Sequence, residues 1–450
     1  MRSRPNRKRA VLLAFILVAA VLSGGCGFGT VEDMLSPPKL TDEQSAIYKA
    51  LTDSKGSGFK LKYPRSGEYR SAFTVYGDVE DAAIVFYEIS GINIERSLWM
   101  NFLFKNEDGA WESTYELPIK GTDIERISFP ILGDDTEPLI LLNYTVSTVS
   151  QNEKAFMIIS GVEEKSVSKF EDFYSFMRVD NFFGKEKREL LIIKNDRGVE
   201  SSTATFYTRR SGRLVSSASC ELDPGAGEYT NITQGYSAKG VPALFINHKK
   251  FENSENYGTD ILYYHGGRLI NPAMIDPANT EKLLRKTGSS SELANPRDIN
   301  GDGIIEVCSS AGEFPGYQNL PASEKPRPVI WRTAINYTFS EILYYSYYTE
   351  KFDFVFFLPS RWINEVTPDI AAEENTVVFQ KAADMETPLL SIRTVFGEDE
   401  PPDSPDWTLF ESGKENGARY YIKTENPGDP LTLTAEELQY AFTILSEITE

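Results

Sequence analysis

The sequence predicts a mainly β protein, with a β-propeller-like repeat domain of about five or more blades followed by a small α+β domain. Three observations lead to this prediction. Short β-rich runs divided by Gly, Asp and Asn fill the chain from about residue 60. One unit recurs within them every 50 to 60 residues or so. Near residue 340 the pattern changes to a few strands and a final amphipathic helix.

The recurring unit is a polar turn, a strongly apolar strand, a partly charged strand, a glycine turn and another strand. The apolar strands begin at Ala82, Leu139, Leu190, Ala243 and Ile304, at spacings of 57, 51, 53 and 61 residues. A multi-stranded unit of this period is typical of propeller blades. Because these strands are continuous apolar runs, we expect each to be the innermost strand of a blade, buried on both faces. A β-sandwich is the competing architecture.

Three dipeptides in the second halves of these units predict hairpin turns. They are Asp108-Gly109, Ser211-Gly212 and Gly266-Gly267. Each joins two strand-like runs and has residues that accept the positive φ angles of tight hairpins.

The first residues have the pattern of a secretory signal, with a basic start followed by an apolar run. The run ends in Leu22-Ser23-Gly24-Gly25-Cys26, which resembles the lipobox of bacterial lipoproteins, although the leucine stands one residue farther from the cysteine than usual. The resemblance implies cleavage before Cys26, lipidation of Cys26, and attachment to the extracytoplasmic face of the cell membrane. An uncleaved membrane anchor is the alternative, and it also places the bulk of the chain outside the cytoplasm.

The chain is therefore divided into four parts. We expect a signal peptide at 1–25, a tether and short helix at 26–58, the repeat domain at 59–340 and the α+β domain at 341–450.

Two helices are expected outside the repeats. The first has Thr41 as its N-cap, and Ile47, Tyr48 and Leu51 share one face. The last has Thr434 as its N-cap, with Leu438, Ala441, Phe442 and Leu445 on one face.

The composition argues against a nucleic-acid partner. The formal net charge is −20, and the basic residues of the signal segment make the remainder more acidic still. Such a surface repels phosphate backbones.

An acidic turn precedes the last apolar strand, in the run Asp298-Ile299-Asn300-Gly301-Asp302-Gly303-Ile304-Ile305-Glu306. Asp298, Asn300 and Asp302 occupy alternate positions, as calcium ligands do in short loops. The Ile304 carbonyl and Glu306 complete a candidate ligand set. Ser309 stands where a helix-loop-helix site would need a glutamate, and the flanking residues predict strands, so an EF-hand is excluded.

This turn resembles the Asp-x-Asn-x-Asp-Gly-x-x-Glu turn of the FG-GAP and VCBS repeats, which are propeller blades. The resemblance implies calcium bound by Asp298, Asn300, Asp302, the Ile304 carbonyl and Glu306, between the outer strand of one blade and the inner strand of the next. It extends weakly over residues 60–340. The equivalent turn "NFFGKEKRE" retains only Asp180 and Glu189, with Lys185 and Lys187 among them. An unmetallated turn is the alternative, because Asp, Asn and Gly favour turns without an ion.

The search for catalytic chemistry yields little. His248 and His265 fall in strands of one predicted blade without further ligands at metal spacing, so we expect packed or surface histidines. Cys220 and Cys308 could pair in an exported protein. The "FDFVFFLPSRW" run weakly resembles the small α+β domains of the PsbP-like group.

Taken together, these features favour a lipid-anchored binding or interaction protein with a structural calcium ion and no turnover. Its partner would be an unknown protein or glycan at the cell surface. The alternative is a cell-envelope hydrolase on a propeller scaffold, in which carboxylates or His248 and His265 would converge in a cleft.

Overall fold

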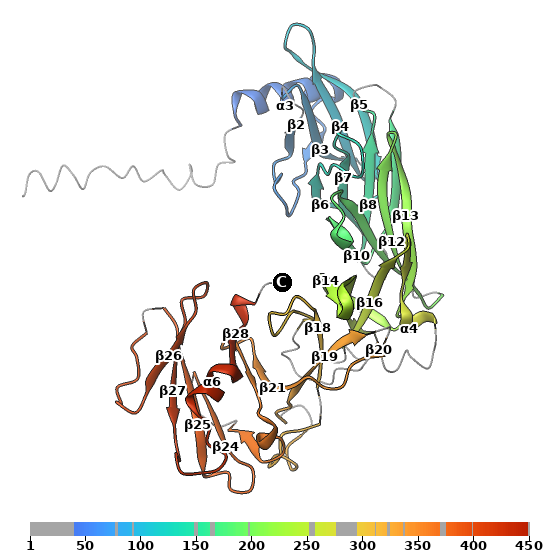
Figure 1. The fold of residues 1–450 in the computed structure, drawn as a ribbon. Helices are drawn as coiled ribbons and strands as arrows, with labels where there is room; N and C mark the ends of the chain where they lie inside the picture. Colours follow the sequence, from blue (N-terminus) through green and yellow to red (C-terminus); the bar gives the residue numbers. More distant parts are fainter. Residues whose placement is uncertain are drawn as a thin grey trace, which may run out of the picture. The chain divides into compact units, whose positions relative to one another are not determined.

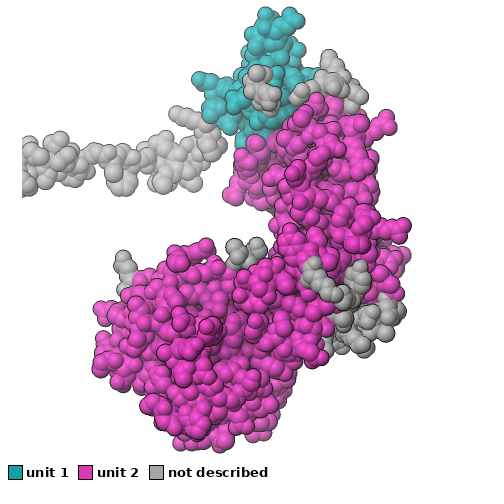
Figure 2. Space-filling view, viewed as in Figure 1, with its two compact units in different colours: residues 1–63, 71–119 teal, residues 64–70, 120–450 magenta. Residues whose placement is uncertain are grey.

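A computed structural model of the chain describes residues 40–448, apart from gaps at 77–79, 92–93, 148–151, 163–166, 197–198, 252–256, 276–294, 311, 322–324, 336–337, 370–374 and 398. The predicted signal peptide, Cys26 and the tether lie outside the described residues. The chain divides into two compact units, residues 1–63 with 71–119 and residues 64–70 with 120–450 (Figure 2).

The described part of the first unit is a five-stranded antiparallel sheet with one helix (Figure 1). Its elements are α3 (Asp42–Lys55), β1 (Phe59–Leu61), β2 (Phe73–Tyr76), β3 (Ala82–Gly91), β4 (Ile94–Lys105) and β5 (Trp111–Ile119). The predicted cap of α3 is confirmed, since the Thr41 hydroxyl accepts a hydrogen bond from the Gln44 amide. Ile47 and Leu51 are buried in the core of this unit, whereas Tyr48 of the same predicted face is largely exposed.

The second unit contains three successive four-stranded antiparallel sheets whose strands pair in chain order. The first is β6 (Asp123–Ser128), β7 (Ile140–Ser147), β8 (Asn152–Ser160) and β9 (Ser168–Phe173). The second is β10 (Phe176–Asp180), β11 (Glu189–Asp196), β12 (Ser201–Arg210) and β13 (Arg213–Leu222). The third is β14 (Ala226–Ser237), β15 (Val241–Lys250), β16 (Tyr257–His265) and β17 (Arg268–Ile270), followed by the short helix α4 (Pro272–Ile275).

These sheets pack face to face, which explains the continuous apolar strands. In β11, Leu190 and Ile192 join one core with residues of β7 and β8, while Leu191 and Ile193 join another with residues of β15 and β16. Successive side chains of a strand point to opposite faces, so a strand between two sheets is apolar at every position. The prediction of strands buried on both faces is confirmed.

The place of these strands within their sheets differs from the prediction. The strands β7, β11 and β15 are each second in order, between two neighbours, and not the innermost strand. Each is preceded by a strand, β6, β10 or β14, that the sequence does not mark as apolar. Among the described residues no sheet closes into a barrel or a propeller.

Two further sheets follow. A six-stranded sheet contains β18 (Glu306–Ser310), β19 (Val329–Ile335), β20 (Thr338–Phe339), β21 (Tyr344–Thr349), β22 (Phe354–Phe357) and β28 (Phe442–Ile444). A five-stranded sheet contains β23 (Val366–Pro368), β24 (Thr376–Lys381), β25 (Pro388–Val395), β27 (Arg419–Thr424) and β26 (Thr408–Ser412). The predicted domain boundary at 340/341 falls between β20 and β21 of the first of these sheets.

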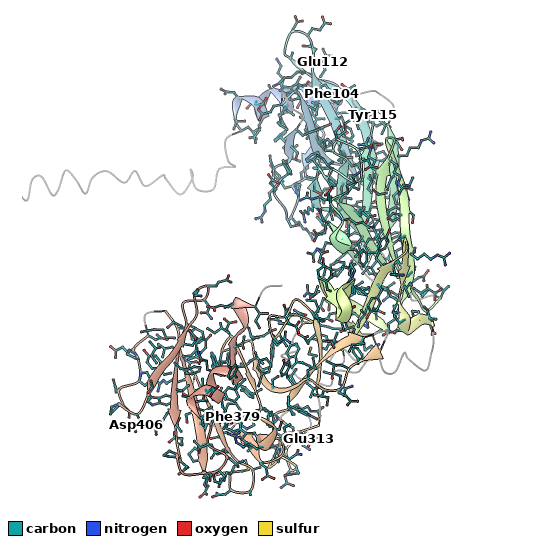
Figure 3. The ribbon with its side chains drawn as sticks, viewed as in Figure 1. Phe104, Glu112, Tyr115, Glu313, Phe379 and Asp406 are labelled. Carbon is teal, nitrogen blue, oxygen red and sulfur yellow. The ribbon has the colours of Figure 1, made fainter. Side chains whose placement is uncertain are left out.

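The final helix, α6 (Ala435–Ala441), begins with the predicted N-cap, because the Thr434 hydroxyl accepts a hydrogen bond from the Glu437 amide. It ends earlier than predicted. Phe442 adopts an extended conformation, and Phe442–Ile444 pairs with β22 as β28. The core around this helix includes Phe379 of β24, which is buried, whereas Asp406 lies at the periphery (Figure 3).

The three predicted hairpin turns are confirmed. They connect β4 to β5, β12 to β13 and β16 to β17. Ser211, Gly212, Gly266 and Gly267 all have positive φ angles, as a two-residue turn of this kind requires.

Candidate metal centre

The acidic loop, residues 298–306, is closed by a backbone bridge between Arg297 and Glu306. Arg297 and Glu306 exchange backbone hydrogen bonds at 3.1 and 2.9 Å, and Glu306 begins β18. The Ile305 amide of the loop also donates a hydrogen bond to the Tyr236 carbonyl of β14, in the preceding sheet, at 2.9 Å. Ile299 is buried in the core beside Trp331 and anchors the loop from below.

The backbone of the loop curls around its own side-chain oxygens. The Asp298 carboxylate accepts hydrogen bonds from the amides of Asp302 at 2.9 Å and Gly303 at 2.7 Å. The Asn300 carbonyl accepts from Asp302 at 3.0 Å, and the Asp302 carboxylate accepts from the Ile304 amide at 2.8 Å. Because these oxygens bind backbone N–H groups of the loop, they are held near one another, while the side chains of Asn300 and Asp302 remain exposed to solvent.

Two glycines make this curled path possible. Gly301 and Gly303 have φ angles of 76° and 84°, a conformation that is costly for residues with a Cβ. An added Cβ would meet nothing within 4 Å at either position. Their role is therefore conformational and not one of close packing.

Glu306 is the unusual member of the group. Its side chain is fully buried; Oε2 accepts a hydrogen bond from the Ile299 amide at 3.1 Å, while Oε1 has no hydrogen-bond partner. Burial, together with the nearby charges of Asp302 and Asp298, raises its pKa to about 8. A buried carboxylate without a cation is strongly unfavourable, so this oxygen marks a place where positive charge is missing.

The donor set suits calcium. Carboxylate and carbonyl oxygens are the ligands that this ion prefers. Within the part of the chain that the structure describes, no three His, Cys, Asp or Glu side chains converge closely enough to hold a metal ion. The carboxylates of Asp298 and Asp302 are thus near enough to affect the pKa of Glu306, but the three groups do not form a coordination shell. A bound ion would have to draw them together. The unpartnered Glu306 oxygen is the observation that fits such an ion.

A second turn, the lysine loop (residues 181–189), is built in the same way. Asp180 and Glu189 pair across it as Arg297 and Glu306 pair across the acidic loop, with residues 181–188 and 298–305 between them. In this alignment Phe182 matches Ile299 as a buried anchor, and Gly184 matches Gly301 with a φ of 67°.

The decisive difference is the residue that matches Asp302, which is Lys185. Its Nζ lies 2.8 Å from Oε2 of Glu189, and the Ser217 hydroxyl donates to Oε1 at 2.6 Å. Glu189 is buried like Glu306, but both of its oxygens are satisfied by the protein. Lys185 also lies over the Tyr264 ring, 4.1 Å from its centroid. The sequence showed this lysine only as an intrusion into the ligand pattern.

The two histidines occupy different environments. His265 is exposed at the end of β16, whereas His248 of β15 is fully buried. The His248 Nε2 lies 3.4 Å from a carboxylate oxygen of Asp260 and 3.7 Å from one of Asp223, and Lys250 pairs with Asp223. Because His248 and Asp260 are fully enclosed, a substrate cannot reach them, and the cluster is part of the core.

The two cysteines do not form a disulfide. Cys220 of β13 and Cys308 of β18 both carry thiols and are not joined by a disulfide bond. Burial raises the pKa of each thiol to about 12, so neither is a reactive thiolate.

No protein-family model and no curated protein matches the sequence. Among the described residues, none of the helices has the length and apolar character needed to cross a membrane.

Proposed function

We propose that this chain is a lipid-anchored extracytoplasmic binding protein whose acidic loop holds a structural calcium ion. The observation that supports it is the buried Glu306 carboxylate, with one unpartnered oxygen beside Asp298 and Asp302. In the lysine loop the same buried position is neutralised by Lys185. No described lysine or arginine forms an ion pair with Glu306, which favours a cation taken from solution.

When calcium is bound, it supplies positive charge to Glu306, Asp298 and Asp302. The Asn300 and Ile304 carbonyl oxygens would complete the set. We expect the ion to hold the loop together and not to act in catalysis, because Glu306 is fully buried and the Asp298 and Asp302 carboxylates already accept hydrogen bonds from the loop's own amides.

The fold proposal is a degenerate propeller of the FG-GAP/VCBS type. Successive four-stranded antiparallel sheets that stack through shared apolar cores support it, since neighbouring blades pack in this way.

Extracellular calcium sites are often weak, so we expect the acidic loop to bind calcium with a dissociation constant in the range of about 10⁻⁴ to 10⁻³ M.

Isothermal titration calorimetry of the full chain in mild detergent tests the calcium site. We expect one calcium ion per chain in the wild type and none in Glu306→Gln, with Glu313→Gln as an exposed control that binds normally. Equal binding by wild type and Glu306→Gln would refute the site.

The anchor is tested separately. Mass spectrometry of the membrane-extracted protein should find an N-terminal Cys26 carrying lipid, and Cys26→Ser should release the protein into the soluble fraction. An unmodified N-terminus beginning at Met1 would contradict the lipoprotein proposal.

A further inference from the structure

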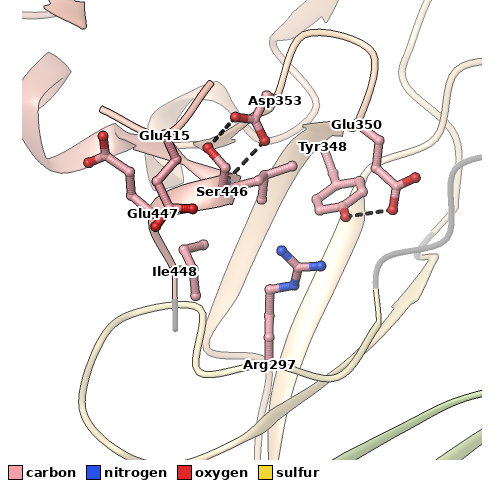
Figure 4. Close-up of a pocket in the computed structure, with 9 residues that line it drawn as sticks. Arg297, Tyr348, Glu350, Asp353, Glu415, Ser446, Glu447 and Ile448 are labelled. Carbon is pink, nitrogen blue, oxygen red and sulfur yellow. Dashed lines mark hydrogen bonds between the residues drawn. The ribbon is translucent and has the colours of Figure 1, made fainter. Parts of the chain in front are cut away.

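A pocket of about 520 Å³ lies beside the acidic loop, between the six-stranded sheet and the C-terminal turn of the chain (Figure 4). Its floor contains Tyr348, Leu445 and Ile448, which offer aromatic and apolar surface. The residue that enters it from the loop side is Arg297, which directly precedes Asp298. Pockets with an apolar floor and a few charged groups are typical of small-molecule sites.

Among the described residues, the Arg297 guanidinium has no hydrogen-bond or ion-pair partner. Its Nε is buried without a hydrogen bond, and no described carboxylate forms an ion pair with the side chain. Figure 4 shows it reaching between Ile448 and Tyr348 into the open space. An arginine fork that is partly desolvated and unpaired suits a planar oxyanion such as a carboxylate, which it binds through two hydrogen bonds.

Acidic side chains also line the pocket, with Glu415 and Glu447 on one side of Arg297 and Glu350 on the other (Figure 4). All three are exposed. Glu350 accepts a hydrogen bond from the Tyr348 hydroxyl at 3.1 Å, and Glu447 accepts one from the Lys414 amide at 2.7 Å. Both carboxylates retain free lone pairs, and Glu415 forms no hydrogen bond or ion pair within the part of the chain that the structure describes.

The carboxylate of Asp353, the fourth acidic residue of the pocket, already accepts hydrogen bonds from the protein. It accepts them from the amide and the hydroxyl of Ser446 at 3.0 and 2.5 Å, and from the Asn416 side chain. It therefore fixes the wall of the pocket instead of contributing a free charge.

The charges of Arg297 and the three glutamates indicate which class of ligand the pocket would bind. A simple anion would meet three glutamates, and a simple cation would meet Arg297. A molecule with both charges, a carboxylate toward Arg297 and an ammonium group toward the glutamates, satisfies both. We propose that this pocket binds a small zwitterion of the amino-acid class. The inference rests on the proposed binding function and names the ligand class for it.

The pocket is joined to the calcium site through one residue. Arg297 provides the backbone bridge to Glu306, so the ion would fix the strand segment from which its guanidinium extends. We therefore expect tighter zwitterion binding with calcium than with chelator.

Ligand-observed NMR titration of the full chain in mild detergent tests the proposal. The probes are glycine, 4-aminobutyrate and 6-aminohexanoate, whose charges are progressively farther apart, with acetate and propylamine as single-charge halves. We expect one zwitterion to bind at least tenfold more tightly than either half, and at least tenfold more weakly to Arg297→Gln.

Arg268→Gln, which removes an exposed arginine on β17, is the matched control and should bind normally. If Arg297→Gln fails to fold, the triple variant Glu350→Gln, Glu415→Gln, Glu447→Gln replaces it, because these side chains are exposed. It should bind the zwitterion at least tenfold more weakly.

Three results would overturn the proposal: no zwitterion binding up to about 10 mM, equal binding of acetate, or unchanged binding by the variants. Titrations in calcium and in chelator separate this inference from the calcium site. Arginine-dependent binding by a chain that takes up no calcium would refute the calcium site alone. Calcium uptake without zwitterion binding would refute the pocket alone.

Discussion

The acidic loop and the lysine loop each bury a glutamate, and they differ in the charge that stands beside it. Both close the same length of chain, both bury an apolar anchor, and both end in a glutamate that begins an apolar strand. In the lysine loop, Lys185 carries the compensating charge within the chain. In the acidic loop the matching residue is Asp302, which adds to the negative charge around Glu306. The comparison leads us to propose that this turn needs a cation, which the chain supplies in the lysine loop and the solution supplies in the acidic loop.

The pH dependence of stability is the largest expected difference. In chelator, Glu306 in the folded protein has a pKa of about 8, above the ordinary value of 4.5. Between these values the folded state binds the proton that the unfolded state has lost, so stability falls as pH rises and levels off above about pH 8. We expect a fall on the order of 3 kcal/mol, read by urea unfolding with tryptophan fluorescence.

Glu306→Gln is the control for this effect and should remove most of the fall. Calcium should reduce it as well, because the ion favours the charged carboxylate. A wild-type profile that matches Glu306→Gln in chelator would show that Glu306 is not the responsible group.

Removing the internal cation should destabilise the other loop. Lys185→Met leaves Glu189 buried without its partner, at an expected cost of about 2 kcal/mol, because the lysine is only partly exposed. Calcium should not restore this loss. Lys187→Met, in the same loop but at an exposed ion pair with Asp134, should cost less than about 1 kcal/mol in the same unfolding measurement.

Exchanging the distinguishing residue should convert one loop into the other. Asp302→Lys places an ammonium group where Lys185 stands in the lysine loop. In chelator we expect a gain of about 1 to 2 kcal/mol over wild type and no response to calcium. Asp302→Asn is the matched variant without a positive charge, and it should gain less. If both variants behave alike, the added charge has no partner in Glu306.

The shared backbone shape gives the smallest expected effect. Gly184→Ala and Gly301→Ala should each cost about 1 kcal/mol, since both positions have positive φ and open space around them. Thermal unfolding of the two variants in chelator checks this. Costs that differ by several fold would show that the two turns are not built alike.

Local patterns in the sequence were sufficient for the elements. Thr41 and Thr434 predict helix starts, and Ser211-Gly212 predicts a hairpin, because caps and tight turns depend on a few neighbouring residues. The continuous apolar run from Leu190 predicts a strand buried on both faces for a similar reason.

Properties that depend on distant pairing were not predictable in this way. The end of α6 at Ala441 is set by pairing of Phe442–Ile444 with β22, far away in sequence. The order of strands within a sheet is likewise a long-range property.

The candidate site also has some features that depend on neighbouring residues and others that depend on distant ones. The ligand pattern of residues 298–306 is visible in the sequence, because its residues are neighbours in the chain. The burial of Glu306 depends on the pairing of β18 with β19, and the surroundings of the Arg297 guanidinium come from β21 and the C-terminal turn. The lysine at position 185 was the available signal for an internal cation, since it stands in a ligand position of an otherwise similar turn.

Thermal unfolding of the full chain in calcium and in chelator, with Asp302→Ala and Lys185→Met beside the wild type, tests the central claim most directly. An ion that binds only the folded state raises its stability, so calcium should raise the midpoint of the wild type by several degrees. The rise should persist in Lys185→Met and be absent in Asp302→Ala. Identical midpoints with and without calcium in all three proteins would contradict the claim that the acidic loop takes its cation from solution.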